Sequence, residues 1–197
     1  MTLSSSADAA PEQGIPRRVL LIVGALVLVA LVLVVLSLRR PELPEFPPTA
    51  AGSAAPSGAG PHQLTIDASD PERWRYVDLA RGAVADDPAA GWDLAFRRFE
   101  LKLNGGGALD LGAVALDSVR SLPDDGYVGM EALGRDTTHA VLDDWYSYSY
   151  TTHVLRPRDR TFAFRTASGR KAALRFVSYY CPGAQPGCVT LRYRFVD

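Results

Sequence analysis

An apolar run from Val19 to Leu38 constrains this chain most, because Ser37 is its only polar member. At about 1.5 Å per residue, an α-helix of this length crosses a hydrocarbon core of about 30 Å. A signal peptide is the alternative, but its apolar core spans only about 7–15 residues and precedes a small-residue cleavage site. Here two arginines and a proline follow the run. We therefore predict an uncleaved transmembrane helix over residues 19–38, with cleavage further along the Ala/Ser-rich stretch as the alternative.

The segments on either side of this run have little capacity to bury apolar surface. Residues 1–18 are short and polar, and we predict a disordered cytoplasmic tail. Residues 39–61 carry six prolines among alanine, glycine and serine, a composition typical of an extended linker. We therefore predict a disordered Pro/Ala/Gly-rich linker over residues 39–61 and a single domain over residues 62–197.

From His62 onward, short apolar alternations are separated by Gly, Pro, Asp and Asn, a pattern typical of antiparallel β structure. We predict a mostly β, antiparallel single domain, with a long excursion over residues 119–142. Residues 91–103 alternate in two phases, which a bulge near Arg97 would reconcile within one long strand. The other predicted strands are Trp74 to Leu79 as the first well-defined one, Ala108 to Leu116, Thr161 to Thr166, Lys171 to Tyr180, and Val189 to Phe195.

Two cysteines bear on the compartment in which the domain folds. Cys181 and Cys188 flank a turn-rich loop between strand-like segments, so a disulfide could close this hairpin in an oxidising compartment. Two unpaired thiols are the alternative. Arginine pairs lie on both sides of the apolar run, so the positive-inside rule does not decide the orientation of the helix. The possible disulfide decides it instead, because it favours a cytoplasmic N-terminus and an extracytoplasmic domain. No cysteine lies directly after the apolar run, since the only two are Cys181 and Cys188, which argues against lipoprotein processing.

Composition and motifs narrow the class of function. The formal net charge of −1 argues against nucleic-acid binding, which usually leaves a basic surplus. The sequence has no nucleophile elbow, phosphate-binding loop or metalloprotease helix. We therefore expect a protein that is not an enzyme and binds no nucleic acid.

Several separated segments resemble the HmuY family of bacterial haem-binding envelope proteins. They are WDLAFRR at residues 92–98, the glycine loop at Asn104, WYSYSYTTHVL at 145–155, FRTASGRKAALRFVSYYC at 164–181 and GCVTLRYRF at 187–195. The resemblance implies a HmuY-like β domain that captures or handles haem non-covalently, with a haem-uptake receptor as a partner. Family members are commonly lipid-anchored, whereas this chain carries an apolar helix. With that helix in a bacterial inner membrane, the domain would be periplasmic.

The resemblance directs attention to a small set of residues that could hold haem. His153, at the end of a tyrosine-rich strand, is the first candidate for an axial iron ligand, and His139 and Met130 in the long excursion are the others. Tyr146, Tyr148 and Tyr150 could form an aromatic wall, and the Arg97 guanidinium could pair with a propionate. Ordinary sheet aromatics and surface histidines are the alternative interpretation. An envelope interaction module that keeps the fold without haem therefore remains the competing prediction.

Overall fold

The computed structural model describes residues 16–38, 42–52, 60–133 and 136–196, and the chain divides into two compact units. The first unit is Met1–Glu42, and its single helix is α1 (Arg17–Leu38). The second is Leu43–Asp197, which contains all the described strands. The prediction of an apolar N-terminal helix followed by a mostly antiparallel β domain is confirmed.

Helix α1 is apolar around its whole circumference. An 18-residue window within Arg17–Val35 has a mean hydropathy of 3.1, and the side chains of these residues are exposed within the unit. Packing on a sheet would cover only one stripe of such a helix and leave the rest of its apolar surface exposed to water. By length and composition, this helix is able to cross a membrane.

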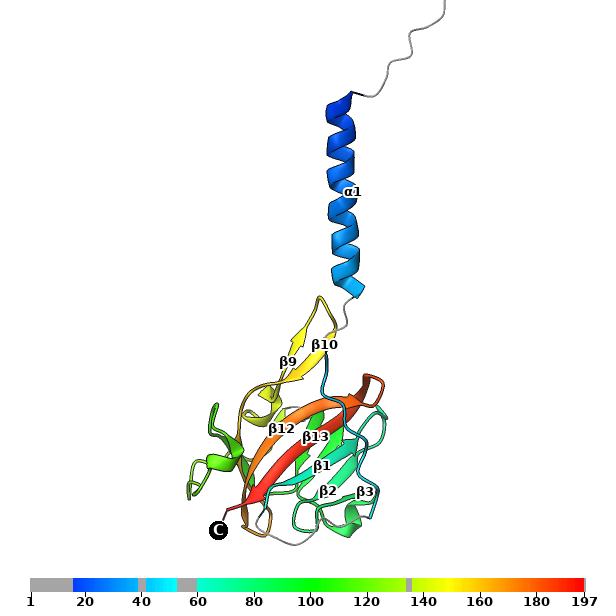
Figure 1. Ribbon diagram of the computed structural model, residues 1–197. Coiled ribbons are helices and arrows are strands. Elements are labelled where there is room, and N and C mark those ends of the chain that lie inside the picture. The colour runs from blue at the N-terminus through cyan, green and yellow to red at the C-terminus, as the bar shows by residue number, and fades with distance from the viewer. Residues whose placement is uncertain (1–15, 39–41, 53–59, 134–135, 197) are drawn as a thin grey trace, which may run out of the picture. The chain divides into compact units, whose positions relative to one another are not determined.

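The β unit consists of two larger antiparallel sheets and two small hairpins (Figure 1). The five-stranded sheet runs in the order β1-β13-β12-β11-β6, and the four-stranded sheet in the order β3-β2-β4-β5. The hairpins are β9-β10 and β7-β8. The strands are β1 (His62–Asp67), β2 (Arg75–Asp78), β3 (Ala83–Ala85), β4 (Leu94–Arg97), β5 (Glu100–Leu103), β6 (Gly107–Asp110), β7 (Glu131–Leu133), β8 (Asp136–Thr138), β9 (Tyr146–Ser149), β10 (Val154–Pro157), β11 (Phe162–Arg165), β12 (Lys171–Cys181) and β13 (Gln185–Phe195). Three 3₁₀ turns accompany them: η1 (Pro88–Ala90), η2 (Leu116–Ser118) and η3 (Leu142–Asp144).

One apolar cluster joins the two larger sheets. Phe96 of β4 meets Phe176 of β12 edge to face, with ring centroids 6.3 Å apart, and both rings are buried. The alternation predicted for the last strand is confirmed, since Leu191 and Tyr193 are buried whereas Arg192 between them is half-buried. Strand alternation therefore places one face of each sheet in a shared core.

The region 91–103 differs from its prediction as one bulged strand. It is a hairpin in which β4 and β5 pair directly, with Arg97 opposite Glu100, so Arg98 and Phe99 form a two-residue turn. Arg98 has a φ of 56°, which a tight turn of this length demands. The change of alternation phase that suggested a bulge is therefore the point at which the chain reverses direction.

Two further strand predictions need correction. β1 (His62–Asp67) precedes the region predicted as the first well-defined strand, and it pairs with β13 along its whole length. The strand predicted over 108–116 is shorter, because β6 ends at Asp110 and the chain then turns into η2. The predicted hairpin of β11 and β12 is confirmed, with Arg165 opposite Lys171.

The predicted linker does not stay separate from the domain over its whole length. Residues 43–52, which we call the strap, hydrogen-bond to three parts of the β unit. Phe46 N donates to Tyr180 O at 3.2 Å, Thr49 N to Thr65 O at 2.8 Å, and Gly52 N to Val84 O at 3.3 Å. The sequence misses this because backbone groups make most of these contacts, and backbone groups leave no trace in composition.

Candidate functional site

The tyrosine-rich segment folds into the β9-β10 hairpin, which projects from the body of the β unit (Figure 1). Its β10 strand is anchored, because Leu155, directly opposite Tyr148, is buried and its backbone N donates to the Tyr180 hydroxyl at 2.9 Å. Trp145, immediately before β9, is fully buried, and its indole Nε1 donates to Phe99 O at 3.2 Å. Buried contacts therefore hold the hairpin against the β unit, while the turn between β9 and β10 is exposed.

Three predicted site residues meet at the tip of this hairpin. The Tyr148 hydroxyl lies 2.8 Å from His153 Nδ1, a hydrogen-bonding distance. The Tyr150 ring meets the Tyr148 ring edge to face, with centroids 5.1 Å apart. The exposed fractions are 43% for Tyr148 and 84% for Tyr150, and His153 is exposed as well. The tip is therefore an aromatic surface open to solvent, with one imidazole in it.

The hydrogen bond to Tyr148 orients the His153 ring. His153 has a φ of 54° at the end of the turn, and its ring faces Tyr148 of β9, to which it is hydrogen-bonded. When Nδ1–H donates to the phenol oxygen, Nε2 carries the lone pair, the arrangement found in metal-binding histidines. The pair is thus suited to present Nε2 to a metal ion.

Tyr146 lies at the base of the hairpin instead of at the tip. It is half-buried, and its ring contacts those of Trp145 at 5.1 Å and Phe99 at 5.7 Å between centroids. Burial raises the pKa of its hydroxyl, so it remains a neutral phenol at physiological pH. Phe99, 44% exposed in the β4-β5 turn, is a further aromatic of this surface that the sequence reasoning placed within a strand. The phase change beside it was the signal that could have found it.

His139 is not at this surface, and its ring makes hydrogen bonds within the fold. The side chain is fully buried, Nε2 donates to Val128 O at 2.8 Å, and Nδ1 accepts from Leu142 N at 3.0 Å. Burial lowers the pKa of this imidazole, so the ring is neutral. These bonds order the entry to η3, and both nitrogens would have to be released before the ring could bind iron. This geometry counts against His139 as an axial ligand.

Met130 and Arg97 also lie in other surroundings. Met130 is partly buried and packs against the main core cluster. The Arg97 guanidinium pairs with Glu100 at 2.6 Å and lies 4.8 Å from the centre of the Trp74 ring. Of the predicted haem-contacting residues, the structure thus brings together Tyr148, Tyr150 and His153, with Tyr146 below them.

The predicted disulfide is present between Cys181 and Cys188 and closes the β12-β13 hairpin. The turn it closes is attached to its surroundings, because Gly183 N donates to Glu45 Oε2 of the strap at 2.8 Å. Arg98 extends from the β4-β5 turn, and its Nη1 donates to Pro186 O of β13 at 3.4 Å and to Ser69 O at 3.1 Å. The turn is therefore a rigid end of the sheet.

Comparison with known proteins shows which family this chain resembles. The HmuY family model, described as HmuY protein, matches residues 70–138. The resemblance to the HmuY family is confirmed. A search of curated proteins finds no match.

Solved structures agree on the HmuY-like fold. A Bacteroides fragilis protein assigned as a lipoprotein is 22% identical, with a TM-score of 0.61 over 72% of this chain and 92% of its own. A Bacteroides vulgatus protein described as HmuY-like and haem-binding is 19% identical, with a TM-score of 0.60 and coverage of 69% and 92%. The apo HmuY analog of Tannerella forsythia is 19% identical, with a TM-score of 0.60 and coverage of 70% and 96%. At this identity the likeness concerns the fold alone.

Proposed function

We propose that this chain is a membrane-tethered haem-binding protein that captures or handles haem non-covalently, without enzymatic activity. Its family supports a haem-binding type of function. The observation that carries the proposal for this chain is the Tyr148–His153 hydrogen bond at an exposed aromatic tip. Haem iron takes an axial imidazole, and a porphyrin face is matched by aromatic side chains.

In the proposed site, His153 supplies Nε2 to the iron and Tyr148 holds the imidazole in the required orientation. Tyr150 and Tyr148 provide aromatic area for the macrocycle. This choice among the predicted ligands follows from accessibility, since His139 is buried and already hydrogen-bonded, whereas His153 is exposed. The tip is also held on a rigid base, which lowers the cost of ordering the ligand-binding groups.

For location, we propose a single-pass inner-membrane protein with the N-terminus in the cytoplasm, the β domain in the periplasm and a haem-uptake receptor as partner. Helix α1 has the length and composition of a bilayer anchor. The Cys181–Cys188 disulfide is the kind of bond that persists in an oxidising compartment. The apolar helix and the lipoprotein assignment of one structural neighbour suggest an envelope protein.

A haem titration of the fragment Leu43–Asp197 tests the proposal. This fragment contains the whole described core and retains the strap, which a fragment starting at His62 would lose. We expect a saturable one-to-one Soret spectrum that His153→Ala alters and His62→Ala leaves unchanged. His62 lies in β1, away from the hairpin tip, so it is the matched control.

Each other outcome has a distinct meaning. Saturable binding that survives His153→Ala but changes in Tyr148→Phe would make the phenol oxygen the ligand, since tyrosine also holds haem iron in some proteins. Absorbance that never saturates in a fragment with a cooperative thermal transition would contradict haem binding. The alternative, an envelope interaction module with the same fold, would then be favoured.

A further inference from the structure

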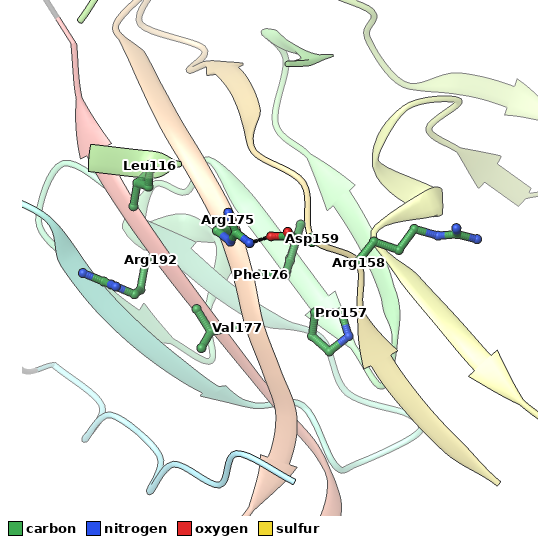
Figure 2. A pocket seen from close by; sticks show the side chains of 8 residues that line it. All are labelled: Leu116, Pro157, Arg158, Asp159, Arg175, Phe176, Val177 and Arg192. Atoms are coloured by element: carbon green, nitrogen blue, oxygen red, sulfur yellow. Dashed lines mark ion pairs between the residues drawn. The ribbon is translucent and has the colours of Figure 1, made fainter. Parts of the chain in front are cut away.

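A pocket of about 320 Å³ lies on the face of the five-stranded sheet that points away from the core (Figure 2). Arg175 of β12 lies between the core residues Leu174 and Phe176, so alternation directs it to this outer face. The pocket walls come from η2, from the chain after β10, and from β12 and β13. Its volume is at the small end of the range for ligand sites, about 300–1,000 Å³.

The floor of the pocket carries an unfavourable pair of like charges. Arg175 and Arg192 are direct partners across β12 and β13. Like charges directly opposite one another destabilise a sheet, so this arrangement invites an anion. Among the residues that the structure describes, Arg192 makes no ion pair. Arg194, next on the same face of β13 but outside the pocket lining, has a buried Nε with no hydrogen-bond partner in the described part of the chain.

Asp159 is the one acidic group at the pocket, and it pairs with Arg175 (Figure 2). The Asp159 side chain is 77% exposed and stands on the loop after β10, whereas Arg175 is fixed on a central strand and is 28% exposed. An ion pair with a solvent-exposed partner contributes little to stability. An incoming anion can therefore replace Asp159 at Arg175 without breaking a strong interaction.

Arg158 does not belong to this group, although it borders the pocket. Its guanidinium points away in Figure 2. It pairs with Asp144 at 3.1 Å, and its Nε donates to Tyr146 O at 3.1 Å. Leu116 and Val177 add apolar wall beside the two remaining arginines. The pocket thus combines the Arg175 guanidinium, the Arg192 side chain and a short apolar surface. The Arg192 guanidinium points away from the Arg175–Asp159 pair in Figure 2, so it has to turn to reach a ligand there.

We propose that this pocket binds a small organic anion, whose carboxylate or phosphate head lies on Arg175 and Arg192 and whose short apolar body lies against Leu116 and Val177. Guanidinium donors match the paired oxygens of both head groups. Asp159 is the internal competitor that the head group displaces, and Arg192 turns toward it on binding. The site is separate from the hairpin tip and does not depend on haem.

Calorimetric titration of the full chain in nonionic detergent tests this inference, with inorganic phosphate, butyrate and butyl phosphate as probes. We expect saturable binding, tightest for a probe with a butyl chain, and a loss of about tenfold or more in Arg175→Gln and in Arg192→Gln. Arg73→Gln is the matched control, because Arg73 is an exposed arginine paired with Asp70 elsewhere on the domain. It should bind like the wild type.

The opposite charge change gives a second, sharper arm. Asp159→Asn removes the competitor and should tighten binding several-fold, whereas Asp70→Asn, which removes the same charge from the Arg73 pair, should not. If each pocket variant and its control changed the affinity equally, the change would reflect only the altered net charge, and the proposal would be overturned. Absence of saturable binding to all three probes, in both the wild type and Asp159→Asn, would overturn it as well. Butyrate and butyl phosphate distinguish a carboxylate ligand from a phosphate.

Discussion

The hairpins β9-β10 and β12-β13 differ in what surrounds them, although both are antiparallel and aromatic. β12-β13 is central in the five-stranded sheet, is flanked by β1 and β11, and has a disulfide at its turn. β9-β10 has no further strand partner within the described residues, and its tip tyrosines face solvent. The same alternating pattern therefore produces core where both edges of a hairpin are covered and an exposed aromatic surface where they are not.

Disrupting the contact between the two hairpins should lower the free energy of unfolding more than any other change considered. Trp145 is fully buried at the base of β9, and its ring lies 4.6 Å between centroids from Phe176 of β12. We expect Trp145→Ala to lower the free energy of unfolding by about 3–5 kcal/mol, because it leaves a large cavity. Chemical denaturation measures this. Trp92→Ala, at a half-buried position, should cost clearly less, and equal losses would contradict the anchoring role.

Removing the disulfide tests what makes β12-β13 the more rigid hairpin. The double variant Cys181→Ser and Cys188→Ser should lose about 2–3 kcal/mol, because the unfolded chain is no longer closed into a short loop. In the same denaturant series, the reduced wild type should unfold at the same denaturant concentration as the variant. A variant as stable as oxidised wild type would show that the strap and Arg98 hold the turn without the covalent bond.

The pH dependence of stability tests the role of His139, which lies in the long excursion shortly before β9. Burial lowers the pKa of His139 from 6.5, so the unfolded chain takes up a proton at a higher pH than the folded protein does. The stability that this group contributes is present above pH 6.5 and is lost as the pH falls below it. His139→Gln should cost about 1–3 kcal/mol at pH 7.5 through lost hydrogen bonds. It should also flatten the decline in melting temperature between pH 7.5 and pH 5.

The smallest effect on stability is expected at the tip. Tyr148→Phe removes only an exposed hydroxyl, so the free energy of unfolding should change by less than about 0.5 kcal/mol. In haem titrations the same variant should weaken binding or alter the spectrum, because the His153 ring loses its orienting contact. Tyr76→Phe is a control on the four-stranded sheet. An altered stability with an unaltered spectrum would assign Tyr148 to the fold alone.

The comparison also separates what the sequence predicts well from what it does not. Period-2 alternation predicted the faces of β13 over residues 191–195, where buried and half-buried side chains alternate, although Thr190 on the opposite face is buried too. The glycine between β11 and β12 marked a turn. The β4-β5 turn was missed because Arg98 and Phe99 are not typical turn residues. At the site, the sequence placed His153 beside the tyrosines. It could not foresee the buried hydrogen bonds of His139, because these depend on backbone groups distant along the chain.

The strap has a mechanical consequence. Tension applied at the N-terminal side of residue 43 is transmitted along the strap before it reaches β1, since the strap comes first along the chain. The bond of Phe46 to Tyr180 O bears that load ahead of the bond of Thr49 to Thr65 O. The strap bonds would then break one after another, in their order along the chain, before force reaches the sheet through β1. A pull on the segment before the strap would therefore load these few contacts before it loads β1.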